Sequence, residues 1–169
     1  MLLDSAVTVT LRTAARGDDA LIRRLFTDSR AADFAHLPGT DAAAQAIVDL
    51  QFTAHAAMLS TRYPDAEHKV ITAHGSPVGH IVTNTLPGSI RLVDIAVLAE
   101  HQGHGLGTAV LDALLSHADA TVRTVELSVW ELNEPAIRWY QRHNFITTGA
   151  VGGRLAMRRP AHLKQGIPA

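Results

Sequence analysis

The sequence predicts a single α/β domain with about seven strands and about four helices. The chain has 169 residues, enough for one hydrophobic core and too few for two ordinary domains. Its apolar residues recur with a helical period in some segments and alternate with polar residues in others. Gly- and Pro-containing turns separate these segments, and no internal repeat interrupts them. We expect the domain to span 1–160, followed by a flexible tail at 161–169.

The N-terminal part of the chain is predicted to form one strand and two helices. Residues 7–12 (VTVTLR) alternate β-branched and polar side chains, as a half-buried strand does. Acidic residues after Gly17 open a helix that continues to Phe26. Asp41 is expected to cap a longer helix that ends near Ser60 and carries an apolar stripe. The stripe consists of Ala44, Ile47, Val48, Phe52 and Leu59.

The rest of the chain alternates strands and helices. Within 69–84 the period changes from 3.6 to 2, which predicts two strands around the turn Gly75-Ser76-Pro77. The elements expected after this hairpin are a strand at 90–98, a helix at 106–118, a strand at 125–130, a helix at 133–143, and strands at 145–148 and 154–157.

Composition excludes several classes of protein. A formal net charge of -1 argues against a nucleic-acid-binding surface. The absence of cysteine excludes disulfides, thiolate nucleophiles and Cys-ligated metals, and the ten histidines show no metal-binding spacing on a helix face, so we expect no metal site. The sequence has neither a signal-peptide pattern nor an uncharged apolar run of about 18 residues, which predicts a cytoplasmic protein without membrane contact.

The segment 101–108 (HQGHGLGT) carries a glycine at every second position between a strand and a helix. It does not fit the dinucleotide fingerprint, because the third glycine position falls on Thr108 or Val110, and it lacks the lysine of a triphosphate-binding loop. Glycines let main-chain N–H groups converge, and the start of the helix adds unpaired N–H groups and a positive dipole. The loop therefore indicates a diphosphate site that needs no metal, or else only a connector.

This loop and the segment after it resemble the GNAT superfamily of acetyl-CoA-dependent N-acetyltransferases. Gln102-x-x-Gly105-x-Gly107 matches the family's Gln/Arg-x-x-Gly-x-Gly/Ala motif, which follows the fourth strand. Residues 133–145 (NEPAIRWYQRHNF) match its later Asn-x-x-Ala…Tyr…Gly-Phe helix, with Asn144 in place of glycine. Asparagine also accepts a left-handed helix cap, so the turn should be retained. The resemblance implies the GNAT acyltransferase fold, an α+β arrangement around a central mixed, mostly antiparallel sheet.

The resemblance also implies a site for acetyl-CoA. The main chain of Val97 and Leu98 would pair with the pantetheine arm, and the loop would hold the pyrophosphate. Asn133 would contact the cofactor, although it also suits a helix cap. Tyr140 would protonate the departing thiolate, or else simply fill the core. The implied cofactor-binding residues are Val97, Leu98, Gln102, Gly103, His104, Gly105, Leu106, Gly107, Thr108, Asn133 and Tyr140.

Two further features concern the phosphates. His104 stands where many relatives have an arginine in the loop, which makes any side-chain charge there weaker and dependent on pH. Arg138 and Arg142 are candidates for binding the 3′-phosphate instead.

Asp94 is the candidate general base. An alkyl ammonium with a pKa of about 10 is charged at pH 7 and must lose a proton before it attacks a thioester. Asp94 lies in an otherwise apolar stretch, 92–97 (LVDIAV), where a carboxylate is unfavourable unless it is paired or its pKa rises. Relatives commonly carry Glu or Asp here, and the N–H of Val97 would steady the oxyanion. The alternative is that Asp94 pairs with Arg91 or another cation on an exposed face.

We therefore expect an N-acetyltransferase that moves the acetyl group of acetyl-CoA to an amine of a small molecule or protein by direct attack in a ternary complex. His36, Gln51 and His55 are predicted to line the acceptor pocket, with ordinary packing as the alternative; Gln51 and His55 fall within the apolar stripe of their helix and should point near the interior. A non-catalytic acetyl-CoA sensor or interaction module is the other function considered. Homodimers are common in the superfamily, but the sequence fixes neither the oligomeric state nor the acceptor.

Overall fold

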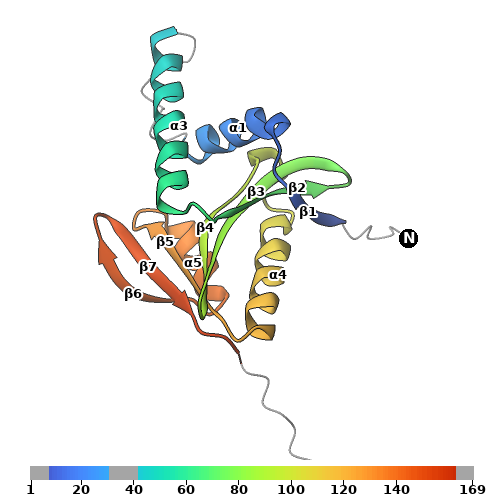
Figure 1. Ribbon diagram of the computed structural model, residues 1–169, viewed down its shortest axis with the longest axis vertical. Coiled ribbons are helices and arrows are strands. Elements are labelled where there is room, and N and C mark those ends of the chain that lie inside the picture. Colours follow the sequence, from blue (N-terminus) through green and yellow to red (C-terminus); the bar gives the residue numbers. More distant parts are fainter. Residues whose placement is uncertain (1–7, 31–41, 163–169) are drawn as a thin grey trace, which may run out of the picture. The chain divides into compact units, whose positions relative to one another are not determined.

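The computed structural model describes residues 8–30 and 42–162 (Figure 1). Seven strands form one sheet in the order β1-β2-β3-β4-β5-β7-β6. The β4–β5 pair is parallel, whereas β1–β2, β5–β7 and β6–β7 are antiparallel. The predicted mixed sheet is therefore confirmed. The strands are β1 (Val9–Thr13), β2 (Glu67–Ala73), β3 (Ser76–Leu86), β4 (Ser89–Val97), β5 (Thr124–Trp130), β6 (Ile146–Val151) and β7 (Arg154–Arg159).

Four α-helices are described, as expected. They are α1 (Asp19–Ser29), α3 (Ala42–Arg62), α4 (Leu106–Ala120) and α5 (Glu134–Arg142), with short 3-10 turns η1 (Arg16–Asp18) and η2 (Ala99–His101). Asp41, the expected cap of the second long helix, lies outside the described residues.

Internal contacts divide the chain into two compact units. The first consists of Met1–Val82 and Asp94–Val110, and the second of Thr83–Val93 and Leu111–Ala169. The strands β3 and β4 and the helix α4 contribute residues to both units.

The first unit contains the N-terminal strands, α1, α3 and the end of β4. Its buried apolar residues include Leu25 and Phe26 of α1, with Val70 and Ile71 of β2. The helices α1 and α3 lie side by side (Figure 1), and the ring centroids of Phe26 and Phe52 are 5.4 Å apart.

The buried stripe of α3 is narrower than its sequence indicates. Val48 is buried, but Ile47 is 41% exposed and Leu50 is 70% exposed. The assignment of Ile47 to the buried stripe was therefore wrong, because the apolar residues of this 21-residue helix are spread over several sides and only some of them are covered.

The second unit is built around β5, which alternates buried and partly exposed residues. Val125, Leu127 and Val129 are buried, and β7 lies between β5 and β6 (Figure 1). All six residues of β6 are exposed. Asn144 precedes this strand with φ of 65°, so the left-handed turn predicted in place of Gly-Phe is confirmed.

An ion pair connects α4 to β7 within the second unit. Nη1 and Nη2 of Arg159 lie 2.8 and 2.9 Å from the two carboxylate oxygens of Asp119, which also accepts the N–H of His162 at 2.7 Å. Arg159 is only 6% exposed. Its hydrogen bonds lower the pKa of Asp119 to about 2. The charge of the buried Arg159 guanidinium is therefore compensated by the carboxylate of Asp119.

Replacing Asp119 with asparagine is expected to lower the free energy of unfolding by about 3 kcal/mol at pH 7, because Arg159 would remain buried without its anion. The folded-state pKa of about 2 lies below the unfolded value of about 3.9, so the stabilisation is complete above pH 4 and disappears as pH falls through 2. Urea unfolding of wild type and Asp119→Asn at pH 7 and pH 3 measures the difference in the free energy of unfolding and its dependence on pH. Asp112→Asn, on the same helix but 60% exposed, is the control; equal losses in both variants would contradict the prediction.

Candidate functional site

The glycine loop forms the connection between η2 and α4. Gly103 and Gly105 have φ of 77° and 76°, and a Cβ added to either would meet nothing within 4 Å. The carbonyl of Gly105 accepts the N–H of Ala109 at 2.9 Å, so Gly105 is the residue from which α4 starts. In a helix the N–H groups of the first turn have no acceptor within the helix. The loop therefore presents bare main chain beside the positive end of a 15-residue helix, an arrangement that suits a phosphate.

The side chain of Gln102 braces this loop against the end of β4. Its Nε2 donates to the carbonyl of Val97 at 2.8 Å. The N–H of Leu98 donates to the carbonyl of Val78 at 2.9 Å, and the carbonyl of Leu98 accepts the N–H of His101 at 2.8 Å. Val97 and Leu98 were both expected to pair with pantetheine. The N–H and the C=O of Leu98 are already hydrogen-bonded to other residues of this chain, which leaves Val97 as the candidate. Because successive residues of a strand direct these groups to opposite edges, the N–H of Val97 faces away from β3.

A glycine on β3 permits this geometry. A Cβ on Gly79 would collide with the carbonyl oxygen of Ala96 and lie 3.2 Å from the Cα of Val97. Any larger residue at this position would push the end of β4 away from β3.

Asp94 is the centre of a polar cluster in the first unit. Its Oδ2 lies 3.2 Å from Nε2 of His80 on β3, and Nδ1 of His80 lies 3.0 Å from Nε2 of His68 on β2. His80 is 5% exposed, whereas the side chain of Asp94 is 40% exposed. Burial raises the pKa of Asp94, but the contact with His80 and the charges of His80 and His55 lower it to below its ordinary value. Asp94 is therefore an ionised carboxylate that reaches solvent.

The surroundings of Asp94 differ in part from those expected from the sequence, and its role as a base stays a prediction. The side chain is less buried than its apolar strand suggests, and its partner is not Arg91, whose Nη2 donates to Oγ of Ser128 at 2.8 Å. The partner, His80, was not identified from the sequence. A single histidine within the apolar run of β3 was the available signal.

Comparison with known proteins now decides the family. The model of the acetyltransferase (GNAT) family matches residues 23–145, which is most of the chain. The chain belongs to the GNAT acetyltransferase family. This acetyltransferase accordingly uses an acyl-CoA.

Solved structures share the fold of this acetyltransferase. The PaiA N-acetyltransferase of Thermoplasma acidophilum, crystallised in complex with coenzyme A, has a TM-score of 0.68 at 13% identity and covers 90% of this chain and 99% of that one. An acetyltransferase of Thermus thermophilus has a TM-score of 0.64 at 23% identity, covering 90% and 97%. The ribosomal-protein-S18-alanine N-acetyltransferase of Escherichia coli has a TM-score of 0.63 at 17% identity, covering 96% and 100%. At these identities the likeness concerns the fold alone.

Asn133 and Tyr140 lie in the second unit of the acetyltransferase. Oδ1 of Asn133 accepts the N–H of Ala136 at 3.2 Å, so Asn133 does cap α5. Tyr140 is 8% exposed, and its ring centroid is 5.0 Å from that of Trp139 and 5.5 Å from that of Phe145. Tyr140 therefore contributes to packing, and its role toward the cofactor stays a prediction.

The residues expected to line the acceptor pocket have different environments. His55 is half-buried, with its ring centroid 5.3 Å from that of Phe26, and it acts electrostatically on Asp94. Gln51 is exposed, so the expectation that it points near the interior was wrong. His36 lies outside the described residues. Of the three, His55 is the residue that the structure associates with the polar cluster.

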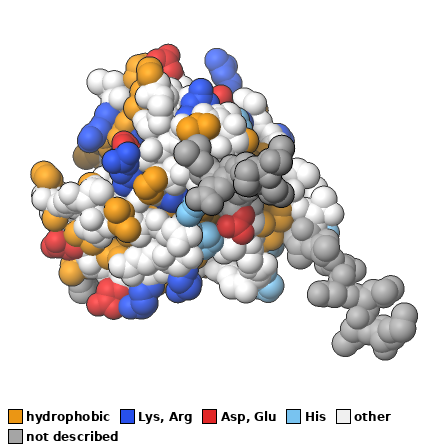
Figure 2. Space-filling model, turned by 90° about the horizontal axis from the view of Figure 1, so that it is seen from below, with side chains coloured by type: hydrophobic (Ala, Val, Ile, Leu, Met, Phe, Trp, Pro, Cys, Tyr) orange, Lys and Arg blue, Asp and Glu red, His pale blue; other side chains and the backbone are white. Residues whose placement is uncertain are grey.

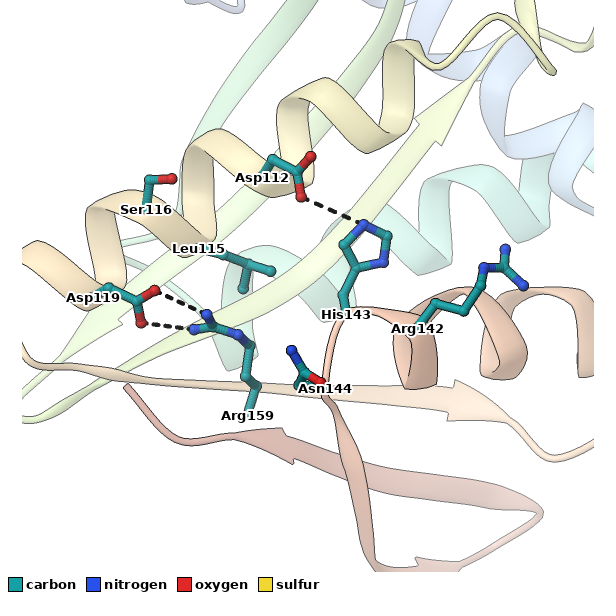
Figure 3. Close-up of a pocket in the computed structure, with 8 residues that line it drawn as sticks. All are labelled: Asp112, Leu115, Ser116, Asp119, Arg142, His143, Asn144 and Arg159. Carbon is teal, nitrogen blue, oxygen red and sulfur yellow. Dashed lines mark hydrogen bonds and ion pairs between the residues drawn. The ribbon is translucent and has the colours of Figure 1, made fainter. Parts of the chain in front are cut away.

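A cavity of about 310 Å³ in the second unit contains Arg142 but is poorly suited to a phosphate (Figure 3). Its lining includes the ion pair of Asp119 with Arg159 and the pair of Asp112 and His143, whose Oδ1 and Nε2 atoms lie 3.5 Å apart. Figure 3 shows the guanidinium of Arg142 directed away from both pairs. The other expected phosphate ligand, Arg138, pairs with Glu134 at 2.9 Å. These contacts therefore do not direct Arg138 and Arg142 toward one shared site for a phosphate.

The described surface agrees with the near-neutral composition. On the face in Figure 2, acidic and basic side chains are interspersed with hydrophobic and polar ones. None of the helices within 8–30 and 42–162 has the length and apolar content needed to cross a membrane. In the same ranges, no three His, Asp or Glu side chains are grouped as metal ligands would be.

Proposed function

We propose that this acetyltransferase moves the acetyl group of acetyl-CoA to an amine of a small molecule or protein by direct attack in a ternary complex. The observation that carries the proposal is Asp94, an ionised and solvent-reaching carboxylate three residues before the end of β4. A carboxylate in this state accepts a proton from an ammonium group. A chain without cysteine suits the reducing cytoplasm, where we propose that it acts.

Each step is assigned to a residue of this chain. Acetyl-CoA supplies the activated thioester, and the glycine loop from Gln102 to Thr108 holds its pyrophosphate. Asp94 removes a proton from the acceptor ammonium, and the resulting amine attacks the thioester carbonyl. The N–H of Val97 stabilises the charge that develops on the carbonyl oxygen. The hydroxyl of Tyr140 protonates the sulfur as it leaves, and the second proton that the nitrogen loses on forming the amide restores the Tyr140 hydroxyl through solvent.

A panel of amines tests this function. The protein is mixed with acetyl-CoA and each amine, and release of the CoA thiol is followed together with the mass of the acetylated product. We expect at least one amine to accelerate thiol release and to gain an acetyl group. Binding of acetyl-CoA without acceleration by any amine in the panel would instead indicate a sensor or interaction module.

Replacing Tyr140 with phenylalanine is expected to lower kcat by about 100-fold and to change the Kd for acetyl-CoA little, because only the proton donor is removed. Calorimetry and steady-state kinetics measure the two quantities. The chain contains only one other tyrosine, so Tyr63→Phe is the matched control. Equal losses of turnover and affinity would mean that Tyr140 contributes packing rather than an acid.

A further inference from the structure

We propose that His80 and His68 are positioning residues for Asp94, which fix one of its carboxylate oxygens through a chain of two imidazoles. This inference rests on the proposed function, in which Asp94 accepts the amine proton. It assigns roles to two histidines that the glycine loop and the family motifs do not include.

The three side chains come from three strands that are consecutive in the sheet. His68 lies on β2, His80 on β3 and Asp94 on β4. The contacts run from Nε2 of His68 to Nδ1 of His80 at 3.0 Å, and from Nε2 of His80 to Oδ2 of Asp94 at 3.2 Å. The two rings meet edge to face, with centroids 4.9 Å apart. Both nitrogens of the buried ring therefore face side chains of the protein.

The proton positions in this chain are constrained. Nε2 of His80 lies within ion-pair distance of Oδ2 of Asp94, at 3.2 Å, and because an ionised carboxylate has no proton to donate, a proton on Nε2 is the arrangement that attracts the carboxylate. Two charged imidazoles 3.0 Å apart would repel each other, so at most one of them is charged. Burial lowers the pKa of His68, and His80 lowers it further, while Asp94 and Asp18 act in the opposite direction. The net lowering of its pKa makes His68 neutral at pH 7, and its Nε2 contacts Nδ1 of His80.

The surroundings of Asp94 explain why His80 matters. His80 of β3 and His55 of α3 favour its ionised form, as does the N–H of Ile95 on its own strand. His68 acts on it through His80, and Asp18 of η1 acts on His68. Burial opposes all of these. Removing His80 would leave burial with less opposition, so the carboxyl of Asp94 would keep its proton up to a higher pH.

The test follows the titration of the Asp94 carboxyl carbon by NMR in the full-length protein, without an acceptor. We expect the midpoint in wild type to lie below that of an ordinary aspartate and to move to higher pH in His80→Leu. His80→Gln retains an N–H donor and should move it less. His68→Leu should produce a smaller upward shift than His80→Leu. His117→Leu, at an exposed position of α4, should leave the midpoint unchanged.

The wild-type protein provides a test that does not depend on any variant folding. Nitrogen NMR of the imidazoles should show a protonated Nε2 in His80 wherever Asp94 is ionised, and the Asp94 carboxyl should also respond as the histidines titrate. An unprotonated Nε2 under those conditions, or an Asp94 midpoint that does not move in His80→Leu, would overturn the proposal.

Activity separates this inference from the proposed function. With an acceptor found in the amine panel, the acidic limb of the pH profile of kcat/KM should move to higher pH in His80→Leu and partly return in His80→Gln. Full activity in Asp94→Asn would overturn the assignment of the base. An inactive Asp94→Asn combined with an unshifted profile in His80→Leu would leave the base intact and overturn the positioning role.

Discussion

Replacing Gly105 with glutamate is expected to abolish measurable binding of acetyl-CoA. Gly105 has φ of 76°, a conformation that costs a non-glycine residue about 1 kcal/mol. The new carboxylate would also stand at the start of α4, where the N–H groups and helix dipole favour an anionic ligand. A negative side chain there both occupies these donors and repels a diphosphate. Calorimetric titration of the variant with acetyl-CoA measures the loss.

Two further variants separate strain from charge. Gly75→Glu, in the β2–β3 turn, has the same open surroundings and a φ of 81°, and it should bind acetyl-CoA like wild type. Gly105→Ala carries the strain without the charge and should lose only part of the affinity. Wild-type affinity in Gly105→Glu would mean that the loop is only a connector between β4 and α4.

Replacing Asp94 with asparagine is expected to lower kcat by about 10²-fold to 10⁴-fold, the usual contribution of a general base, with little change in the affinity for acetyl-CoA. Asparagine is close in shape to aspartate but cannot accept the proton. The loss should shrink as pH rises toward 10, because a growing fraction of the acceptor is then neutral without help. Kinetics between pH 6 and about pH 10 measure both effects.

Asp65→Asn makes the same change of charge in the turn after α3, where the side chain is exposed, and should leave turnover unchanged. If Asp94→Asn changed kcat no more than Asp65→Asn did, and by the same factor at every pH, Asp94 would not be the group that accepts the proton.

The order of elements could be predicted from the sequence because it depends on local periodicity. The cap by Asn133 and the left-handed Asn144 were also predictable, since each is set by residues nearby in the chain. The orientation of α3 was not. A helix with apolar residues on several sides does not show which line is buried, and Val48 rather than Ile47 faces inward.

The environment of Asp94 was missed for a different reason. The contacts among His68, His80 and Asp94 depend on the register of three strands, and register is set by tertiary packing rather than by the local sequence. The same holds for Arg91, which was a plausible partner of Asp94 but reaches Ser128 on the neighbouring strand. The sequence identified the carboxylate, whereas only the fold could identify the histidine that holds it.

The most direct test of the whole account is a calorimetric comparison of acetyl-CoA, CoA and ADP binding to the wild-type protein. We predict that acetyl-CoA and CoA bind in the micromolar range and that ADP binds much more weakly, because in the proposed site the main chain at Val97 would contact the pantetheine arm while the glycine loop would hold the diphosphate. Failure of both CoA compounds to bind, or binding of ADP as tight as that of CoA, would contradict the account, since the mechanism would then lack its acetyl donor.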